Sequence, residues 1–406
     1  MRRDQWNSYN WHEQYQTIRI CEGIIMEYRL EEIFDLQMGK TPSRSNPDYW
    51  NTCENKWISI ADLSKCGKYI ENTKEYLSDQ AVEESGINQI PENTVIMSFK
   101  LSIGKTAITS EPMYSNEAIM SFRDKKMVDI LPDYIFYMFL SRNWDEGTNK
   151  AVMGKTLNKA TLSKIKITLP DIKMQKMVVD ILDKVSDIIA NRKVELEKLD
   201  NLIKARFIEM FGNPVSNSYG LPEATLPDLG KFGRGVSKHR PRNDIKLLGG
   251  KYPLIQTGDV ANAGLYITSY CNTYSELGLK QSKMWDKGTL CITIAANIAK
   301  TAILEFDACF PDSVVGFTAN ERTNNVFIHY WFSFFQAILE SQAPESAQKN
   351  INLKILSELK VIVPEKRKQD EFAAFVAQVD KSKVAVQKAL DQTQLLFDSL
   401  MQAYFG

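Results

Sequence analysis

The sequence has no net charge, because fifty Lys and Arg residues balance fifty Asp and Glu residues. Histidine is scarce, with only His12, His239 and His329, and no two of the six cysteines form a C-x-x-C pair. These absences exclude a polycation that binds nucleic acid through bulk charge, and they favour neither a zinc site nor a disulfide framework. We therefore expect a chain of the reducing cytoplasm that binds no metal ion.

Long apolar runs are absent as well. Runs such as residues 134–140 and 330–335 are far shorter than the ~20 residues of a membrane span. Residues 1–25 lack the apolar core of a secretory signal, and we treat them as an N-terminal extension, with Met26 as an alternative start. The sequence therefore predicts a soluble protein with no membrane partner.

What the sequence does contain is an internal repeat. Three segments of the first half align with the second half at offsets of 194, 195 and 197 residues. The aligned pairs are 157–170 with 351–364, 105–108 with 300–303, and 58–62 with 255–259. The offset changes little, which places the length differences in loops. The chain is predicted to contain two copies of one unit of about 185 residues.

Each copy combines a mixed globular part with a long helix. Short β-rich runs such as 94–99 and 289–294 are interleaved with short helical patterns such as 133–140. Pro170 and Pro364 then stand where a helix can begin but cannot continue through, and a heptad pattern follows each of them. This order predicts an α+β fold whose two globular parts are each followed by a long helix.

Apolar residues recur in steps of four and three for over four heptads after each proline, and a period of 3.5 is typical of a coiled coil. Neither stretch contains Gly or Pro, so each is expected to be an unkinked rod of about 40 residues and about 60 Å. The predicted seam consists of Val178, Leu182, Val185, Ile189, Leu196, Leu199, Ile203, Phe372, Val376, Val379, Val386, Leu390, Phe397 and Leu400.

The pairing of the two predicted helices leaves one alternative open, in which each helix covers only its own globular part. The two seams match in length and phase, and this match favours an antiparallel pair instead. Such a pair also relates the two copies by a pseudo-two-fold axis.

The sequence contains only incomplete versions of known catalytic motifs. Residues 46–49 resemble the N-P-P-Y loop of amino-methyltransferases, but Asp48 replaces the second proline, which favours a simple turn. Residues 232–235 resemble a Gly-rich cofactor turn, but a basic segment broken by Pro241 follows where a helix is needed. No nucleophile or phosphate-binding motif is reproduced by the repeat. We expect no catalytic residue and no metal or other cofactor in this chain.

Basic residues gather in two segments. Residues 231–246 hold six Lys and Arg against Asp244, and residues 147–170 hold five Lys and no acid. A charge cluster is commonly only a solvated face, but the first cluster occupies the place in its copy that residues 39–44 occupy in the other. Lys, Arg and Ser side chains reach phosphates and base edges. The candidate DNA-contacting residues are Lys40, Ser43, Arg44, Lys100, Lys105, Lys155, Asn158, Arg234, Lys238, Arg240, Arg242, Asn297, Lys300, Lys349 and Asn350.

With these features in place, the sequence resembles the specificity (S) subunit of type I restriction-modification systems. The resemblance covers residues 26–406. It is weaker in the second copy, where residues 231–242 and 252–255 replace two sequence motifs of the first copy. It is carried by three sets of residues: 39–43 with 57–63, 158–170 with Gln175, and 211–214 with Asn217 and Gly220.

The resemblance implies an α+β fold of two globular target-recognition domains separated by two long conserved helices that form an antiparallel coiled coil. The implied domains are a target-recognition domain at 26–170, a central helix at 171–211, a linker at 212–222, a second target-recognition domain at 223–364 and a C-terminal helix at 365–406.

The resemblance also implies a function. Each target-recognition domain would read one half of a split, asymmetric site in double-stranded DNA, and the helices would fix the unread spacer. Two methyltransferase subunits would carry S-adenosylmethionine, and two restriction subunits would carry ATP and Mg²⁺. Two other functions stay open from the residues alone, a coiled-coil adaptor without DNA contact and a DNA methyltransferase with its own cofactor site.

Overall fold

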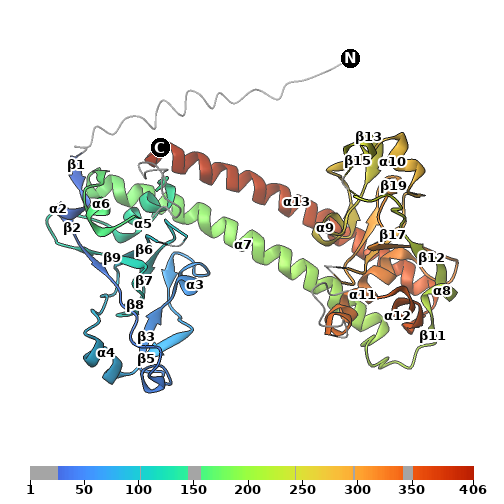
Figure 1. The fold of residues 1–406 in the computed structure, drawn as a ribbon, viewed down its shortest axis with the longest axis horizontal. Coiled ribbons are helices and arrows are strands. Elements are labelled where there is room, and N and C mark those ends of the chain that lie inside the picture. The colour runs from blue at the N-terminus through green and yellow to red at the C-terminus, as the bar shows by residue number, and fades with distance from the viewer. Residues whose placement is uncertain (1–25, 101, 145–156, 243, 296–297, 342–350) are drawn as a thin grey trace, which may run out of the picture. The chain divides into compact units, whose positions relative to one another are not determined.

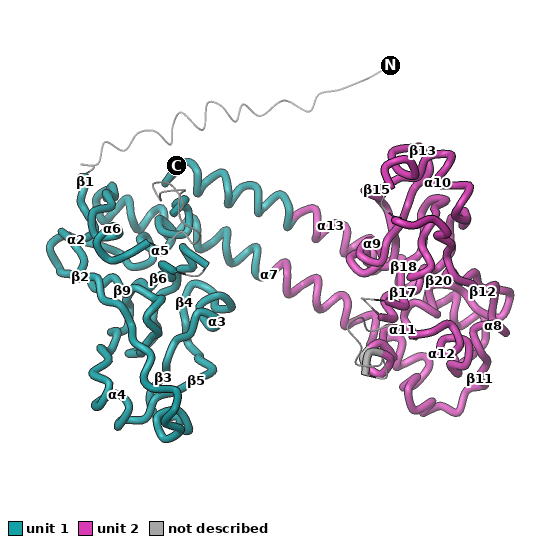
Figure 2. Tube along the Cα trace, viewed as in Figure 1, with its two compact units in different colours: residues 1–191, 390–406 teal, residues 192–389 magenta. Residues whose placement is uncertain are grey.

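The structure, a computed structural model, describes residues 26–100, 102–144, 157–242, 244–295, 298–341 and 351–406. It divides into two compact units (Figure 2), unit 1 with Met1–Asn191 and Leu390–Gly406 and unit 2 with Arg192–Ala389. Two helices of 40 residues each, α7 (Ile172–Phe211) and α13 (Lys366–Phe405), contribute to both units. Within the described segments, no helix combines the length and the apolar character needed to cross a membrane.

Unit 1 contains a five-stranded sheet in the order β2-β9-β6-β7-β4, a three-stranded sheet in the order β5-β3-β8, and the pair β1-β10 (Figure 1). Its strands are β1 (Met26–Arg29), β2 (Phe34–Met38), β3 (Asn55–Ile58), β4 (Tyr69–Ile70), β5 (Glu75–Leu77), β6 (Val95–Ser98), β7 (Thr106–Thr109), β8 (Tyr114–Ser115), β9 (Ile119–Asp124) and β10 (Lys166–Leu169). Its short helices are α2 (Leu30–Ile33), η1 (Pro47–Tyr49), α3 (Ile60–Leu63), α4 (Asp79–Ser85), α5 (Pro132–Ser141) and α6 (Lys159–Ser163).

Unit 2 contains a five-stranded sheet in the order β12-β20-β17-β18-β14, a four-stranded sheet in the order β15-β13-β19-β16, and the pair β11-β21. Its strands are β11 (Glu223–Ala224), β12 (Gly230–Arg234), β13 (Leu248–Leu254), β14 (Tyr266–Ile267), β15 (Asn272–Tyr274), β16 (Met284–Trp285), β17 (Leu290–Thr293), β18 (Thr301–Leu304), β19 (Ala308–Cys309), β20 (Val314–Ala319) and β21 (Val361–Ile362). Its short helices are α8 (Leu226–Leu229), η2 (Ile245–Leu247), α9 (Thr257–Asn262), α10 (Glu276–Lys280), α11 (Asn325–Ser341) and α12 (Leu353–Glu358).

The two units repeat one topology. Across the five-stranded sheets, β2, β9, β6, β7 and β4 occupy the places of β12, β20, β17, β18 and β14. The strand register repeats as well, since Trp57 of β3 lies opposite Glu75 of β5, and Leu254 of β13 lies opposite Asn272 of β15, both at an offset of 197 residues. The predicted α+β fold and the internal repeat are thus confirmed.

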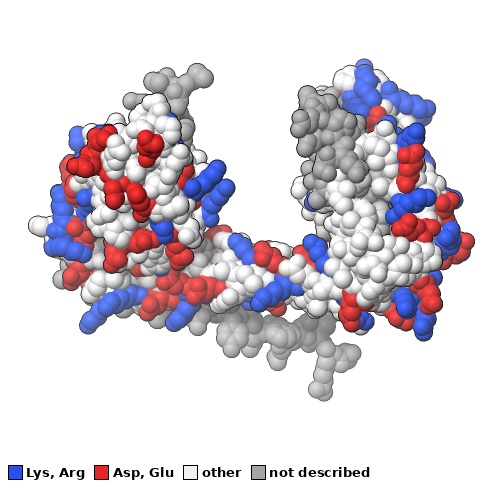
Figure 3. Space-filling view, turned by 90° about the horizontal axis from the view of Figure 1, so that it is seen from below, with Lys and Arg blue, Asp and Glu red and all other residues white. Residues whose placement is uncertain are grey.

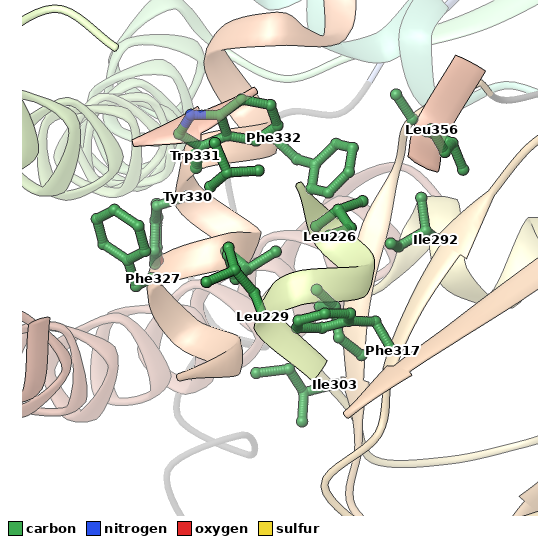
Figure 4. Close-up of a cluster of buried hydrophobic side chains, with 14 of the residues drawn as sticks. Leu226, Leu229, Ile292, Ile303, Phe317, Phe327, Tyr330, Trp331, Phe332 and Leu356 are labelled. Carbon is green, nitrogen blue, oxygen red and sulfur yellow. The ribbon is translucent and has the colours of Figure 1, made fainter. Parts of the chain in front are cut away.

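Both units bury an apolar core between the five-stranded sheet and an adjacent helix. In unit 2 this helix is α11, and Phe327, Trp331 and Phe332 are fully buried on it. Figure 4 shows these side chains beside Ile292 and Phe317 of the sheet. Burial of these aromatic side chains stabilises the globular part of unit 2, because a fully buried Phe contributes about 1.5–3 kcal/mol.

The long helices pack against each other with opposite chain directions inside each unit. In unit 1, Leu182 from the first half of α7 shares a buried cluster with Met401 from the last half of α13. In unit 2, Ile203 from the second half of α7 shares a cluster with Phe372 from the first half of α13. The antiparallel coiled coil is therefore confirmed, and every predicted seam residue is buried or half-buried.

The heptad pattern missed two of the most buried residues of α7. Phe207 and Phe211 are fully buried, and they follow Ile203 in steps of four. Phe207 stacks on Phe327 of α11 with ring centroids 5.3 Å apart and meets Phe372 edge-on at 5.4 Å. At this end α7 packs on the globular part of unit 2 as well as on α13, and the wider apolar stripe of an ordinary surface helix replaces the narrow seam.

Candidate nucleic-acid interface

The predicted DNA-contacting loops occupy equivalent places in the two units. Each loop follows the edge strand of the five-stranded sheet and begins with a glycine, Gly39 after β2 and Gly235 after β12. The Gly39 N–H donates to the carbonyl of Ile119 at 3.1 Å, and the Gly235 N–H donates to the carbonyl of Val314 at 2.9 Å. We call residues 39–46 and 235–242 the glycine loops of units 1 and 2.

Both glycines are required by a close approach of backbone. A Cβ atom on Gly39 would lie 2.1 Å from the carbonyl oxygen of Ser115, and one on Gly235 would lie 2.3 Å from that of Phe310. No side chain fits at such distances, so only glycine can hold the loop against the strand behind it.

This equivalence corrects one interpretation of the sequence. Residues 231–242 do not replace the whole motif that begins at Gly39, because Gly235 is equivalent to Gly39 and preserves the first glycine of that motif. Arg234, predicted as a loop residue, lies on β12 opposite Val315. Its side chain is exposed, but it belongs to a strand whose geometry the sheet fixes.

In unit 1 the arginine of the glycine loop lies in an aromatic and acidic environment. The Arg44 guanidinium lies 3.6 Å from the ring centroid of Trp50 and 5.0 Å from that of Trp57. It forms a two-point ion pair with Glu75 of β5, although half of its side chain is exposed. The stack holds the guanidinium plane in one orientation, which reduces the conformational entropy lost when it binds a planar partner.

Four more polar side chains of this loop form hydrogen bonds within the unit. The Lys40 ammonium donates to the carbonyl of Ser85, Ser43 and Ser45 share a hydrogen bond of 2.8 Å, and Thr41 donates to Glu117. The Thr41 hydrogen bond lowers the pKa of Glu117. Lys40 and Ser43 nevertheless stay exposed at the surface, where they can exchange these partners for phosphate oxygens.

In unit 2 two arginines of the glycine loop share one carboxylate. Arg240 lies 3.4 Å from Asp312, and Arg242 pairs with the other oxygen of the same side chain. The Arg240 guanidinium also donates to the carbonyls of Ser237 at 2.6 Å and His239 at 2.8 Å. Lys238 is exposed, and its backbone N–H donates to Gln281.

The remaining candidates are dispersed. Lys100 and Lys105 lie in the connection between β6 and β7, and Lys300 precedes β18. Asn158 caps α6 by accepting the Thr161 N–H at 2.9 Å, which gives its amide oxygen a structural role. Lys155, Asn297, Lys349 and Asn350 lie outside the described residues.

The surface charges of both units are mixed in sign. Figure 3 shows Lys and Arg side chains interspersed with Asp and Glu side chains on the visible face of each unit. In the described part of the chain, no group of three or more His, Cys, Asp or Glu side chains could hold a metal ion. The arrangement is suited to recognition through individual guanidinium and amide groups rather than through a broad positive surface.

Comparisons with known proteins agree with this layout. Residues 25–200 and 223–393 each match the family described as "Type I restriction modification DNA specificity domain". A specificity subunit of the type I restriction enzyme MjaIX from Methanocaldococcus jannaschii is 24% identical over 275 residues, which cover 63% of this chain and 62% of that protein. The EcoR124I/EcoR124II specificity subunit of Escherichia coli is 28% identical over 193 residues, 45% of each chain.

The chain thus aligns with less than two thirds of the length of these relatives. Solved structures support the fold over nearly the whole chain. One chain of a type I restriction-modification assembly superposes with a TM-score of 0.60 at 14% identity, over 95% of this chain and 98% of that one. The type I specificity subunit from M. genitalium superposes with a TM-score of 0.55 at 14% identity, over 95% and 97%.

The fold and the doubled domain define a two-domain specificity protein. The chain belongs to the family of type I restriction-modification specificity subunits, as both family matches place it there.

Several residues of the candidate interface were not predicted from the sequence. Glu75 and Asp312, which hold the loop arginines, come from segments far away in the chain, and Trp50 is brought under Arg44 by the turn at η1. The offset of 195 residues between Ile119 and Val314, the acceptors of the two glycine N–H groups, is the signal that identifies the second glycine loop.

Proposed function

We propose that this chain is the DNA-reading subunit of a type I restriction-modification complex. The target-recognition domains at 26–170 and 223–364 each read one half of a split site in double-stranded DNA. The linker at 212–222 and the helices at 171–211 and 365–406 join them. The observation that carries the proposal is the repeated glycine loop, which presents an exposed arginine at the same place in both units.

The chemistry of the two loops supports base reading. A guanidinium that is already planar and oriented binds the O6 and N7 atoms of guanine through two hydrogen bonds, and such a contact contributes about 1–3 kcal/mol of discrimination. The neutral net charge is compatible with this role, because partner subunits can supply phosphate contacts while this chain supplies specificity.

The chain itself performs no catalytic step in this proposal. Two methyltransferase subunits bind S-adenosylmethionine and modify adenine, and two restriction subunits use ATP and Mg²⁺ to cleave. The specificity subunit positions them on DNA by binding them along its helices and globular parts.

The test begins by sequencing methylated adenines in a host that carries the full system. We expect a motif of two short defined sequences separated by a spacer of fixed length. A single uninterrupted motif, or no motif, would contradict the proposal. Substitutions in the glycine loops then show which unit reads which half-site.

Arg44→Ala should relax recognition of one half-site and Arg240→Ala recognition of the other, each by about 5- to 150-fold. Arg242→Ala should affect the same half as Arg240→Ala. Equal losses on both halves from one substitution would argue against two independent readers, and no loss from any variant would argue against the glycine loops as the reading elements.

A further inference from the structure

The two units fill the space between the glycine loop and the neighbouring sheet in different ways. In unit 1, Trp57 of β3 is 2% exposed and donates its indole N–H to the carbonyl of Lys40 at 3.0 Å. Trp50 meets it edge-on with ring centroids 4.9 Å apart, and Arg44 lies over Trp50. Three flat groups therefore pack between the loop and the sheet.

In unit 2 the corresponding positions carry smaller side chains. The shared strand register places Leu254 where unit 1 has Trp57. Each of these residues also pairs with a parallel strand, and there Cys309 stands where unit 1 has Tyr114. Two aromatic rings of unit 1 are thus missing from unit 2 at this place.

Unit 2 has a hollow of about 350 Å³ that Leu254 lines together with Tyr274, which stands where unit 1 has Leu77. This volume lies in the range of small-molecule sites. The hollow is lined by Arg242, Leu248, Leu254, Gln256, Thr257, Asn272, Tyr274, Pro311 and Ser313.

The lining has the chemistry of a site for a flat, uncharged, hydrogen-bonding ring. Leu254 and Tyr274 supply apolar surface, and Arg242 is the one charged side chain among the lining residues. Gln256 and Asn272 each offer an amide that carries donors as well as an acceptor. An anionic group would find only Arg242 inside the hollow, with Arg240 beside it in the same loop.

We propose that this hollow binds a single unstacked nucleobase of the DNA that unit 2 reads, with its phosphate near Arg240 and Arg242. The inference rests on the proposed DNA-reading function and adds a binding site to it. Unit 1 carries an indole where unit 2 admits the base, so the two units read DNA by different means. Unstacking a base costs free energy, and stacking against aromatic or guanidinium groups together with hydrogen bonds to the amides offsets that cost.

Leu254→Trp tests the site by restoring the side chain of unit 1. The complex of the full chain with its methyltransferase subunits is titrated with duplexes that carry both half-sites or either one. Filling the hollow should weaken binding to the half-site of unit 2 at least tenfold and leave the other half-site unchanged. Cys271→Trp is the control, because it adds an indole at an exposed neighbouring position outside the lining; it should bind like the unsubstituted chain.

A second measurement follows the base directly. Duplexes with 2-aminopurine at successive positions of the unit 2 half-site should show increased fluorescence at one position with the unsubstituted complex and none with Leu254→Trp. Equal DNA binding by Leu254→Trp and the unsubstituted complex, or no fluorescence increase at any position, overturns the inference while the proposed function stands.

Two further outcomes are informative. Loss of the methyltransferase subunits from the Leu254→Trp complex, with DNA binding unchanged, assigns the hollow to a protein partner and also overturns the inference. Failure of the unsubstituted complex to bind either half-site overturns both the inference and the proposed function.

Discussion

In each glycine loop, the arginine side chains form ion pairs with one carboxylate of the same unit. Glu75 pairs with Arg44, and Asp312 pairs with both Arg240 and Arg242. All of these side chains are a third to a half exposed, so each pair contributes only about 0–1 kcal/mol to stability. Their greater effect falls on binding, because DNA must displace the carboxylate before the guanidinium can make a contact.

Asp312→Asn should therefore raise affinity for unrelated DNA and lower the ratio of specific to non-specific binding. Freeing two guanidinium groups should also steepen the salt dependence of non-specific binding, by about 1–2 in the slope of log affinity against log salt. Glu75→Gln should produce the same change with a slope increase of about 1. Fluorescence anisotropy with a random duplex at several salt concentrations measures both effects.

The control for this prediction is Glu321→Gln, which removes an exposed negative charge from unit 2 without touching a loop arginine. If Glu321→Gln raises non-specific affinity as much as Asp312→Asn does, net charge alone explains the change and the specific role of Asp312 is refuted.

His329 makes unit 2 sensitive to acid. Burial, reinforced by the charge of Lys383, lowers the pKa of His329 from 6.5 to about 4, and its Nδ1 atom lies 2.9 Å from the Thr301 hydroxyl. The folded state thus keeps the ring neutral over a range in which the unfolded state binds a proton. The resulting stability is complete above pH 6.5 and is lost as the pH falls towards 4.

We expect the free energy of unfolding of unit 2 to fall by about 2 kcal/mol between pH 7 and pH 5 because of this one group. His329→Gln keeps a hydrogen-bonding side chain but cannot titrate, so the variant should lack that part of the pH dependence. Urea unfolding of both proteins at the two pH values isolates the effect. Parallel pH profiles of variant and unsubstituted chain would refute it.

At the scale of helices and strands, a buried glutamine fixes each long helix to its globular part. Gln175 donates to the carbonyls of Asp129 at 3.0 Å and Pro170 at 2.9 Å. Gln369 repeats this arrangement with Arg322 at 3.0 Å and Pro364 at 2.8 Å. The 194-residue offset predicted that these glutamines are equivalent, and the structure gives the physical reason, because each side-chain amide pairs the carbonyl of the proline before its helix and a carbonyl of the globular part.

Gln369→Leu should destabilise unit 2 by about 2–4 kcal/mol, because it leaves two carbonyls and the Thr323 hydroxyl without their partner. Gln394→Leu is the matched control on the same helix, since Gln394 is exposed and bonds only to Asp398 among the described residues. Limited proteolysis across a temperature series measures the difference. Equal resistance of the two variants would show that the junction contributes little.

The sequence predicted those helices and domains whose residue pattern recurs along the chain. The two long helices and their antiparallel seam followed from more than four heptads each, and the α+β units followed from the offset alignments. Contacts between distant segments were beyond such reasoning. The hollow of unit 2 is lined by Leu254, which stands where unit 1 has Trp57, and that equivalence can be recognised only when the strand register is known.

At the scale of the whole molecule, the two long helices belong to both units, and neither contains a glycine or proline. We propose that these helices set the length of the unread DNA spacer. A helix rises 1.5 Å per residue and DNA rises about 3.4 Å per base pair, so seven residues correspond to at most about three base pairs.

The test deletes one heptad from both helices, within residues 184–198 of α7 and within the antiparallel partner segment 386–398 of α13. Removing seven residues from each preserves the heptad phase and the facing apolar residues. The preferred spacer should shorten by at most about three base pairs while both half-site sequences stay the same. Sequencing of methylated adenines in cells that carry the variant complex reads out both properties at once. An unchanged spacer would refute the measuring role of the helices, whereas altered half-sites would show that the helices also shape the reading loops.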